Sequence, residues 1–201
     1  MSFFENTRKP VGFGGKLMVV MMNLGHSPVA RWGLQFLELA PDAKALDCGC
    51  GGGANMKRLL KKCPQGVIKG IDYSPVSVEK SKKVNEAAIA EGRCTVLQGS
   101  VADMMFADNW FDAVTAFETV YFWPDLPQCF REVYRVLRPG GTFLICNESS
   151  GDTDKDERWT RLIGGMTIYK DIELKAYLEQ AGFHEVQIHK KKNWLCITAW
   201  K

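Results

Sequence analysis

The sequence predicts an α/β fold in which a doubly wound, mostly parallel sheet of seven strands carries helices on both faces. Three observations predict it. Short apolar runs alternate with amphipathic segments from residue 41 onward, and glycines and prolines separate them. The last two apolar runs, 185–190 and 194–200, lie too close together for a helical crossover, so we expect an antiparallel hairpin. With 201 residues, 46% of them hydrophobic, the chain fits one globular domain with an appendage.

The first forty residues have a helical character. Ser27-Pro28 is a typical helix start, a capping hydroxyl followed by a residue whose φ suits the first turn. Val29, Trp32 and Phe36 then recur at helical spacing until Pro41. The earlier apolar stretch 17–22 has no polar face and is expected to be a buried helix.

The remaining elements follow in order along the chain. Apolar runs predict strands at 45–48, 67–72, 95–98, 111–117 and 142–146. Helical spacing predicts helices at 54–62, from Ser74-Pro75 to about residue 91, at 125–137 and at 171–181. Pro139-Gly140-Gly141 ends the third of these helices, and Gly182 ends the fourth.

Charge and cysteine content narrow the function classes. A net charge of +3 is too mild to indicate nucleic acid or an anionic membrane as partner, so a small molecule is the expected ligand. The seven cysteines contain no CxxC pair, and no metal site is predicted. Reduced thiols, together with the lack of a spanning segment or a basic leader, predict a cytoplasmic protein.

The densest signal is the segment 45–53, a short strand followed by Gly49, Gly51, Gly52 and Gly53 and then by a helix. Open α/β sheets bind ligands at this point, because bare glycine backbone and a helix N-terminus both face the crevice. Asp72 ends the next strand, 21 residues after Gly51. A carboxylate there can accept two hydrogen bonds from the vicinal hydroxyls of a ribose, so the pattern predicts a nucleoside-bearing ligand.

Two ligand classes share this pattern. Gly49-x-Gly51-x-x-Ala54 can be interpreted as a dinucleotide fingerprint, which would make the protein an NADP-type dehydrogenase. Against that interpretation, Asp47 stands directly before the glycines, where its charge would repel a pyrophosphate. A cationic ligand such as a sulfonium removes the conflict.

Several segments in a fixed order carry a family resemblance. They are the glycine motif 46–53, Gly70-Ile71-Asp72-Tyr73-Ser74, the loop 98–103, Phe111-Asp112-Ala113-Val114 with Phe117-Glu118-Thr119, and Val136-Leu137-Arg138-Pro139-Gly140-Gly141. Together they resemble the class I S-adenosylmethionine-dependent methyltransferases over about residues 41–201. The resemblance implies a Rossmann-like methyltransferase domain at 41–201 and an N-terminal helical cap at 1–40 over the active site.

The resemblance also implies S-adenosyl-L-methionine as cofactor, S-adenosyl-L-homocysteine as product, and a role for each matching residue. Asp72 would hold the ribose, Tyr73 would pack on the adenine, and Glu118 would line the methionine end. The methionine moiety would be held by Asp47, Gly49, Cys50, Gly51 and Gly53, and the base would be bordered by Ser100 and Val101. Ser100 departs from the family, which often has an acidic residue there, and Asp103 is the candidate to replace it.

Methyl transfer needs a general base only when the acceptor is an oxygen or a protonated amine. The candidates are Glu118, Tyr121 and His26. Each has a plainer interpretation: Glu118 as a cofactor contact, Tyr121 as part of an aromatic wall with Phe122 and Trp123, and His26 as a surface or capping residue. The prediction is methyl transfer to a small molecule, with neither nucleic acid nor a membrane as partner. A protein that binds the cofactor without catalysis stays an alternative, and the acceptor and the oligomeric state stay open.

Overall fold

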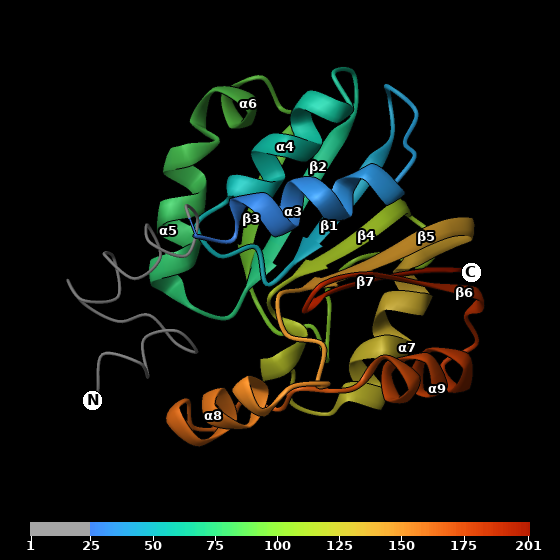
Figure 1. Cartoon of the computed structure of the whole chain (residues 1–201). Coiled ribbons are helices and arrows are strands. Elements are labelled where there is room, and N and C mark those ends of the chain that lie inside the picture. The colour runs from blue at the N-terminus through green and yellow to red at the C-terminus, as the bar shows by residue number, and fades with distance from the viewer. Residues whose placement is uncertain (1–24) are drawn as a thin grey trace.

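The computed structural model describes residues 25–201, without the side chains at positions 154, 155 and 157. Its centre is a seven-stranded sheet in the order β3-β2-β1-β4-β5-β7-β6 (Figure 1). The stretch 17–22 and most of the predicted 1–40 cap lie outside the described residues.

The strands confirm the predicted doubly wound sheet. Five strands run parallel to one another: β1 (Lys44–Cys48), β2 (Val67–Asp72), β3 (Cys94–Gln98), β4 (Phe111–Phe117) and β5 (Leu137–Asn147). β6 (His184–Lys191) and β7 (Trp194–Trp200) form the expected antiparallel hairpin, and β7 also pairs antiparallel with β5. β5 begins at Leu137, earlier than predicted, because Leu137 already pairs with Phe111 before a bulge.

Helices cover both faces of the sheet (Figure 1). One face carries α3 (Ser27–Gly33), α4 (Ala54–Lys62), α5 (Pro75–Val84) and α6 (Glu86–Ala90). The other carries α7 (Leu126–Val136) and α9 (Asp171–Gln180). The chain also forms single 3-10 turns at η1 (Leu34–Phe36) and η2 (Val120–Phe122), and a helix α8 (Asp154–Leu162) that was not predicted.

Two predicted helices differ in detail. The first is shorter than expected, because α3 ends at Gly33 and only the η1 turn follows before the chain extends. Its N-cap is His26, and the Ser27 hydroxyl instead accepts a hydrogen bond from Arg58 Nη2 at 2.6 Å. The second is divided at Asn85, whose amide donates to the carbonyls of Gly53 and Ser81. The predicted Ser74 cap is confirmed, since its hydroxyl accepts from the backbone of residue 77.

Close packing of α4 on the sheet fixes where the glycine loop stands. A Cβ added to Gly70 on β2 would lie 2.4 Å from Sδ of Met56 in α4, so a bare backbone is required there. Met56 and Leu59 are fully buried in the apolar layer on this face. The N-terminus of α4, and the loop that precedes it, are therefore held against the carboxyl ends of β1 and β2.

Among residues 25–201, no helix combines the length and the apolar character that crossing a bilayer requires.

Candidate active site

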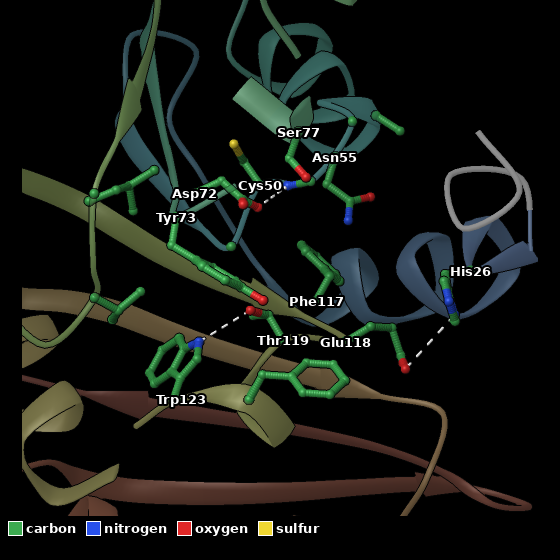
Figure 2. Close-up of a pocket in the computed structure, with 18 of the residues that line it drawn as sticks. His26, Cys50, Asn55, Asp72, Tyr73, Ser77, Phe117, Glu118, Thr119 and Trp123 are labelled. Atoms are coloured by element: carbon green, nitrogen blue, oxygen red, sulfur yellow. Dashed lines mark hydrogen bonds and ion pairs between the residues drawn. The ribbon is translucent and has the colours of Figure 1, made fainter. Parts of the chain in front are cut away.

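A cavity of about 310 Å³ opens at the carboxyl ends of β1, β2 and β4 (Figure 2). Most of the predicted site residues line it: His26, Gly49, Cys50, Gly51, Asp72, Tyr73, Ser100, Val101 and Glu118. Three predicted residues, Asp47, Gly53 and Tyr121, are not part of its lining. The volume is at the lower end of the range for small-molecule sites.

The glycine loop presents bare backbone to the cavity. The amides of Gly49 and Cys50 both donate to the carbonyl of Ile71, at 2.8 and 3.1 Å, which ties the loop to the end of β2. Gly49 has φ +72° and faces Thr119, whereas Gly51 has φ +50° and open space where a side chain would begin. Both positions have left-handed backbone, which glycine adopts without steric cost.

Asp72 joins the two loops that border the cavity. Its Oδ2 accepts from the backbone of Gly51 at 2.8 Å and its Oδ1 from the backbone of Ser74 at 2.9 Å. Burial raises the pKa of the carboxyl group, and the two N–H donors act against that rise. Each oxygen keeps a further lone pair, so the ligand role predicted for Asp72 remains compatible with these bonds.

Asp47 and Tyr121 lie behind the cavity wall. The carboxyl group of Asp47 is 1% exposed and accepts from the Thr115 hydroxyl at 2.8 Å. Burial raises its pKa to about 7. The Tyr121 hydroxyl accepts from the backbone of Ser149 at 3.0 Å and is also buried, away from the lining. Asp47 can therefore influence the cavity only through the charge that it carries when ionised, and Tyr121 bonds to the chain after β5.

The remaining lining residues form walls of different character. Tyr73 is 39% exposed, and Ser100 and Val101 lie on the loop after β3. Asp103, the candidate replacement for an acidic residue at position 100, is exposed and not part of the lining. Trp123 and Phe122 supply the predicted aromatic wall, and the Trp123 indole donates to the Thr119 hydroxyl at 3.2 Å.

No individual role was predicted for several residues of the site. Asn55, Ser77, Arg58 and Thr119 line the cavity, and Glu148 contacts two residues that do. Glu148 carried a usable signal, because it directly follows β5, whose carboxyl end lies beside that of β4. Arg58 and Asn55 project from the first turns of α4, which the glycine motif alone does not reveal.

At one end of the cavity, Glu118, His26 and Glu148 form a connected group of three side chains, which we call the acidic triad. Glu118 follows β4 with a left-handed φ of +58°, and one of its carboxylate oxygens, Oε1, accepts from the backbone of Glu148. Nδ1 of His26 lies 3.3 Å from Oε2 of Glu148 and 3.8 Å from Oε2 of Glu118. Figure 2 shows the second of these contacts at the end of the cavity away from Asp72.

The charges of the acidic triad influence one another. Burial, and to a lesser degree the charge of Glu148, raise the pKa of Glu118 to about 7, although His26 acts in the opposite direction. Burial alone would lower the pKa of His26, but the two carboxylates raise it above its ordinary value. Glu118 can thus exchange a proton near neutral pH, as a general base must.

The acidic triad is also the group in the described part of the chain whose geometry comes nearest to a metal centre. One ligand atom from each residue lies within 4.8 Å of the others. His26 contacts Glu148, and a backbone bond holds Glu118, but Nδ1 of His26 keeps no hydrogen-bond partner. The prediction of no metal stays a prediction.

Comparisons with known proteins agree with this geometry. The family model described as "Methyltransferase domain" matches residues 46–145. Cycloartenol-C-24-methyltransferase of Arabidopsis thaliana is 31% identical over 160 residues, which are 75% of this chain and 47% of that protein. The chain thus spans less than half of this curated relative.

Solved structures share the fold. Phosphoethanolamine N-methyltransferase 2 of Haemonchus contortus, solved with S-adenosylhomocysteine, superposes with a TM-score of 0.81 at 14% identity, over 100% of this chain and 61% of that one. The [4+2]-cyclase SpnF superposes with a TM-score of 0.72 at 18% identity, over 87% and 80%. At these identities the likeness establishes the seven-stranded fold alone.

Proposed function

The chain belongs to the class I S-adenosylmethionine-dependent methyltransferases, and from that premise we propose that it transfers a methyl group from S-adenosyl-L-methionine to a small-molecule acceptor, releasing S-adenosyl-L-homocysteine. The observation that carries the proposal is the cavity at the carboxyl ends of β1, β2 and β4, bordered by bare glycine backbone and by Asp72.

The residues present fit this cofactor. Gly51 lines the cavity and offers open space where other residues would place a Cβ, so a ligand can approach the main chain closely. Asp72 stands beside that backbone, in reach of a ribose, and Tyr73 offers an exposed ring for the base. The negative charge of Asp47, directly behind the loop, favours a sulfonium over a pyrophosphate.

Methyl transfer from a sulfonium requires little chemical activation by the protein. S-adenosylmethionine supplies a methyl group on a positively charged sulfur, a leaving group that is already activated. The chain's own contribution is alignment: the loop 49–53 and Asp72 fix the nucleoside and methionine parts, while Phe117, Phe122 and Trp123 exclude water from the end where an acceptor would bind. The faces of these rings also attract positive charge.

Two alternatives can be compared with this proposal. The family match disfavours the NADP-type dehydrogenase, which rested on the glycine pattern alone. A protein that binds the cofactor without transferring methyl stays an alternative, which the transfer assay below tests. The sterol methyltransferase names describe relatives of which this chain spans less than half, so a sterol acceptor is not carried over.

The mild net charge, and the absence of any spanning helix among residues 25–201, support a small-molecule partner rather than nucleic acid or a membrane. The seven cysteines are all free thiols and all buried, which supports the cytoplasm as location.

Calorimetric titration with S-adenosylmethionine, S-adenosylhomocysteine and NADPH tests the cofactor. We expect both sulfur compounds to bind and NADPH to fail. Transfer of a radiolabelled methyl group to members of an acceptor library then tests the activity. Binding of NADPH alone would refute the proposal, and cofactor binding without transfer to any acceptor would favour the non-catalytic alternative.

A further inference from the structure

The acidic triad of Glu118, His26 and Glu148 allows an inference about the acceptor, which rests on the proposed function. We propose that this group binds the acceptor as a protonated amine and that Glu118 takes the proton from its nitrogen before methyl transfer. Glu118 is then the catalytic residue, and Glu148 and His26 are positioning residues that act through it.

The balance of charge at the triad favours a cationic acceptor. Only two of the described lining side chains can be cationic, Arg58 and His26, and the guanidinium of Arg58 is already bonded to Asn55 and Ser27. Within the triad, the carboxyl groups of Glu118 and Glu148 face the single imidazole of His26. Full ionisation of these three groups leaves one negative charge, which a single ammonium group would neutralise.

That negative charge lies at one end of the cavity. Figure 2 shows Glu118 and His26 at the end away from Asp72, with the ring of Phe117 between the two ends, and Glu148 contacts His26. The part of the site left for an acceptor is thus walled by rings and closed by carboxylates. Ring faces and carboxylates both attract an ammonium group, and neither offers a donor pair suited to a carboxylate or a phosphate.

Nδ1 of His26 also leaves room for a further partner. Among the described residues of the lining it is the one buried side-chain polar atom without a hydrogen-bond partner, although Glu148 and Glu118 lie at ion-pair distances from it. Buried polar atoms usually have a partner. An ammonium group has donors enough for the two carboxylates and for Nδ1 of a neutral imidazole.

The proposed step balances in protons and electrons. An N–H bond of the ammonium breaks, its proton passes to Oε2 of Glu118, and the electron pair stays on nitrogen. That pair forms the new N–C bond as the C–S bond breaks, and the S–C pair remains on sulfur as a thioether. Positive charge thereby moves from sulfur to nitrogen, toward the carboxylates. The triad would stabilise the charge where it develops in the transition state.

Glu148 influences this step in two separable ways. Its backbone N–H holds Oε1 of Glu118 and fixes the carboxylate in place, while its side chain contacts His26. Replacing Glu148 by Gln keeps the backbone donor and removes only the charge. The groups that face Glu118 from the elements around it are His26, Glu148, Tyr121 and Cys146. Burial raises the pKa of the Tyr121 hydroxyl well above its ordinary value, and the contact with Cys196 raises the pKa of the Cys146 thiol in the same direction.

The experiment compares amines with matched alcohols and native enzyme with variants. A library of primary and secondary amines, each paired with the alcohol that carries OH in place of nitrogen, is assayed with radiolabelled S-adenosylmethionine. We expect transfer to amines only. With the best amine, kcat/KM is then measured as a function of pH. Glu118→Gln should lower kcat/KM about 100-fold or more and remove its rise on the acidic side of the pH profile. Glu148→Gln should lower kcat/KM about tenfold and shift the pH at which that rise occurs.

Controls separate this inference from the proposed function. Asp152→Asn changes a nearby exposed carboxylate that pairs with Lys190 and should leave both the rate and its pH profile unchanged. S-adenosylhomocysteine affinity, measured by calorimetry, should stay within about twofold in Glu148→Gln and Asp152→Asn, because neither removes a residue of the cavity lining. Glu118→Gln should lower that affinity by a smaller factor than it lowers kcat/KM. If the cofactor does not bind the native protein, the proposed function itself has failed.

Three results would overturn the inference while leaving the proposed function standing. Transfer to alcohols, thiols or hydrocarbons, or to no amine in the library, would exclude an ammonium acceptor. A pH profile that is identical in native enzyme and Glu148→Gln would exclude the positioning role. Activity that is lost with a chelator and restored by Mn²⁺ or Zn²⁺, together with ion binding that Glu148→Gln abolishes, would make the triad a metal centre instead.

Discussion

Gly49 and Thr119 pack so closely that a Cβ added to Gly49 would lie 2.0 Å from the Thr119 Oγ1. The contact joins the loop after β1 to the segment after β4, so these two borders of the cavity stand at a fixed separation. Thr119 in turn accepts from the indole of Trp123, which extends the connection to the aromatic wall. The shape of the site thus depends on having glycine, which has no side chain, at position 49.

Gly49→Ala should therefore destabilise the protein. The left-handed φ of +72° costs an alanine about 1–2 kcal/mol, and the clash with Thr119 adds about 1–3 kcal/mol. A chain of this size loses about 2–4 °C of melting temperature per kcal/mol, so the melting temperature should fall by about 4–20 °C in a thermal unfolding experiment. A melting temperature within a degree of the native value would contradict the packing described.

Gly51→Ala makes the matched comparison, because it has a similar backbone conformation without the clash. Its φ is +50°, and a Cβ there meets nothing within 4 Å. We expect a stability loss of only about 1–2 kcal/mol. Affinity for S-adenosylhomocysteine should fall about tenfold or more, since the new methyl group would occupy space next to bare backbone. If calorimetry shows unchanged affinity, the cofactor does not approach Gly51.

Asp72→Ala tests the ribose contact. We expect the dissociation constant of S-adenosylhomocysteine to rise by the equivalent of about 1.5–3 kcal/mol, the range for hydrogen bonds to a charged group. Because Asp72 also accepts from the backbone of Gly51 and Ser74, thermal unfolding must be measured in parallel. Asp72→Asn keeps one acceptor oxygen, so its dissociation constant for S-adenosylhomocysteine should lie between those of the native protein and Asp72→Ala. An unchanged dissociation constant in the alanine variant would remove Asp72 from the ribose role.

Most of the fold could be predicted, because each strand and helix has its own local signal. β2 and β4 match their predicted bounds, and the β6–β7 hairpin follows from the short connection between two apolar runs. The break at Asn85 could not be predicted, because it depends on an amide that bonds to Gly53 in a distant loop. The early end of the first helix was missed because the helical spacing of apolar residues continues past Gly33, where α3 stops and only the η1 turn follows.

The candidate site was predicted in part. Motif residues such as Gly51, Asp72 and Glu118 line the cavity, because the ends of parallel strands meet at one edge. The depth of a side chain could not be predicted, and Asp47 proved to be buried behind the loop rather than open to the cavity. No individual role could be predicted for Glu148, because its contacts are with His26 and Glu118, which lie far from it in the sequence.

Asp47→Asn should change how stability depends on pH. The ordinary pKa of an aspartate is 3.8, and burial raises that of Asp47 to about 7 in the folded protein. Between these values the folded state holds a proton that the unfolded chain has lost, so the free energy of unfolding falls as pH rises from about 4 to about 7. Asparagine cannot ionise, and it keeps an oxygen for the Thr115 hydroxyl.

Denaturant unfolding of the cofactor-free protein at about pH 5 and about pH 8 measures this effect. Native protein should lose stability between the two values, and Asp47→Asn should lose distinctly less. Asp103→Asn, at an exposed position outside the cavity, should behave as the native protein does. Equal losses in native protein and Asp47→Asn would show that Asp47 is ionised normally in the folded state.

Gly33→Ala tests how α3 is held against the sheet. A Cβ at Gly33 would lie 2.5 Å from Sγ of Cys146 on β5, and Cys146 is fully buried between the helix and the sheet. The helix must move outward to accept the methyl group, at a cost of about 1–3 kcal/mol. Because His26 is the N-cap of this helix, the same movement would carry Nδ1 away from Glu148.

Two measurements on Gly33→Ala separate packing from function. Thermal unfolding should show the stability loss, and Gly164→Ala, where a Cβ has open space, should show none. Methyl transfer should fall more than S-adenosylhomocysteine affinity, since the displaced residue stands at the acceptor end of the cavity rather than beside Asp72. If affinity and transfer fall by the same factor, α3 supports the cofactor site as a whole and His26 has no separate role in placing the acceptor.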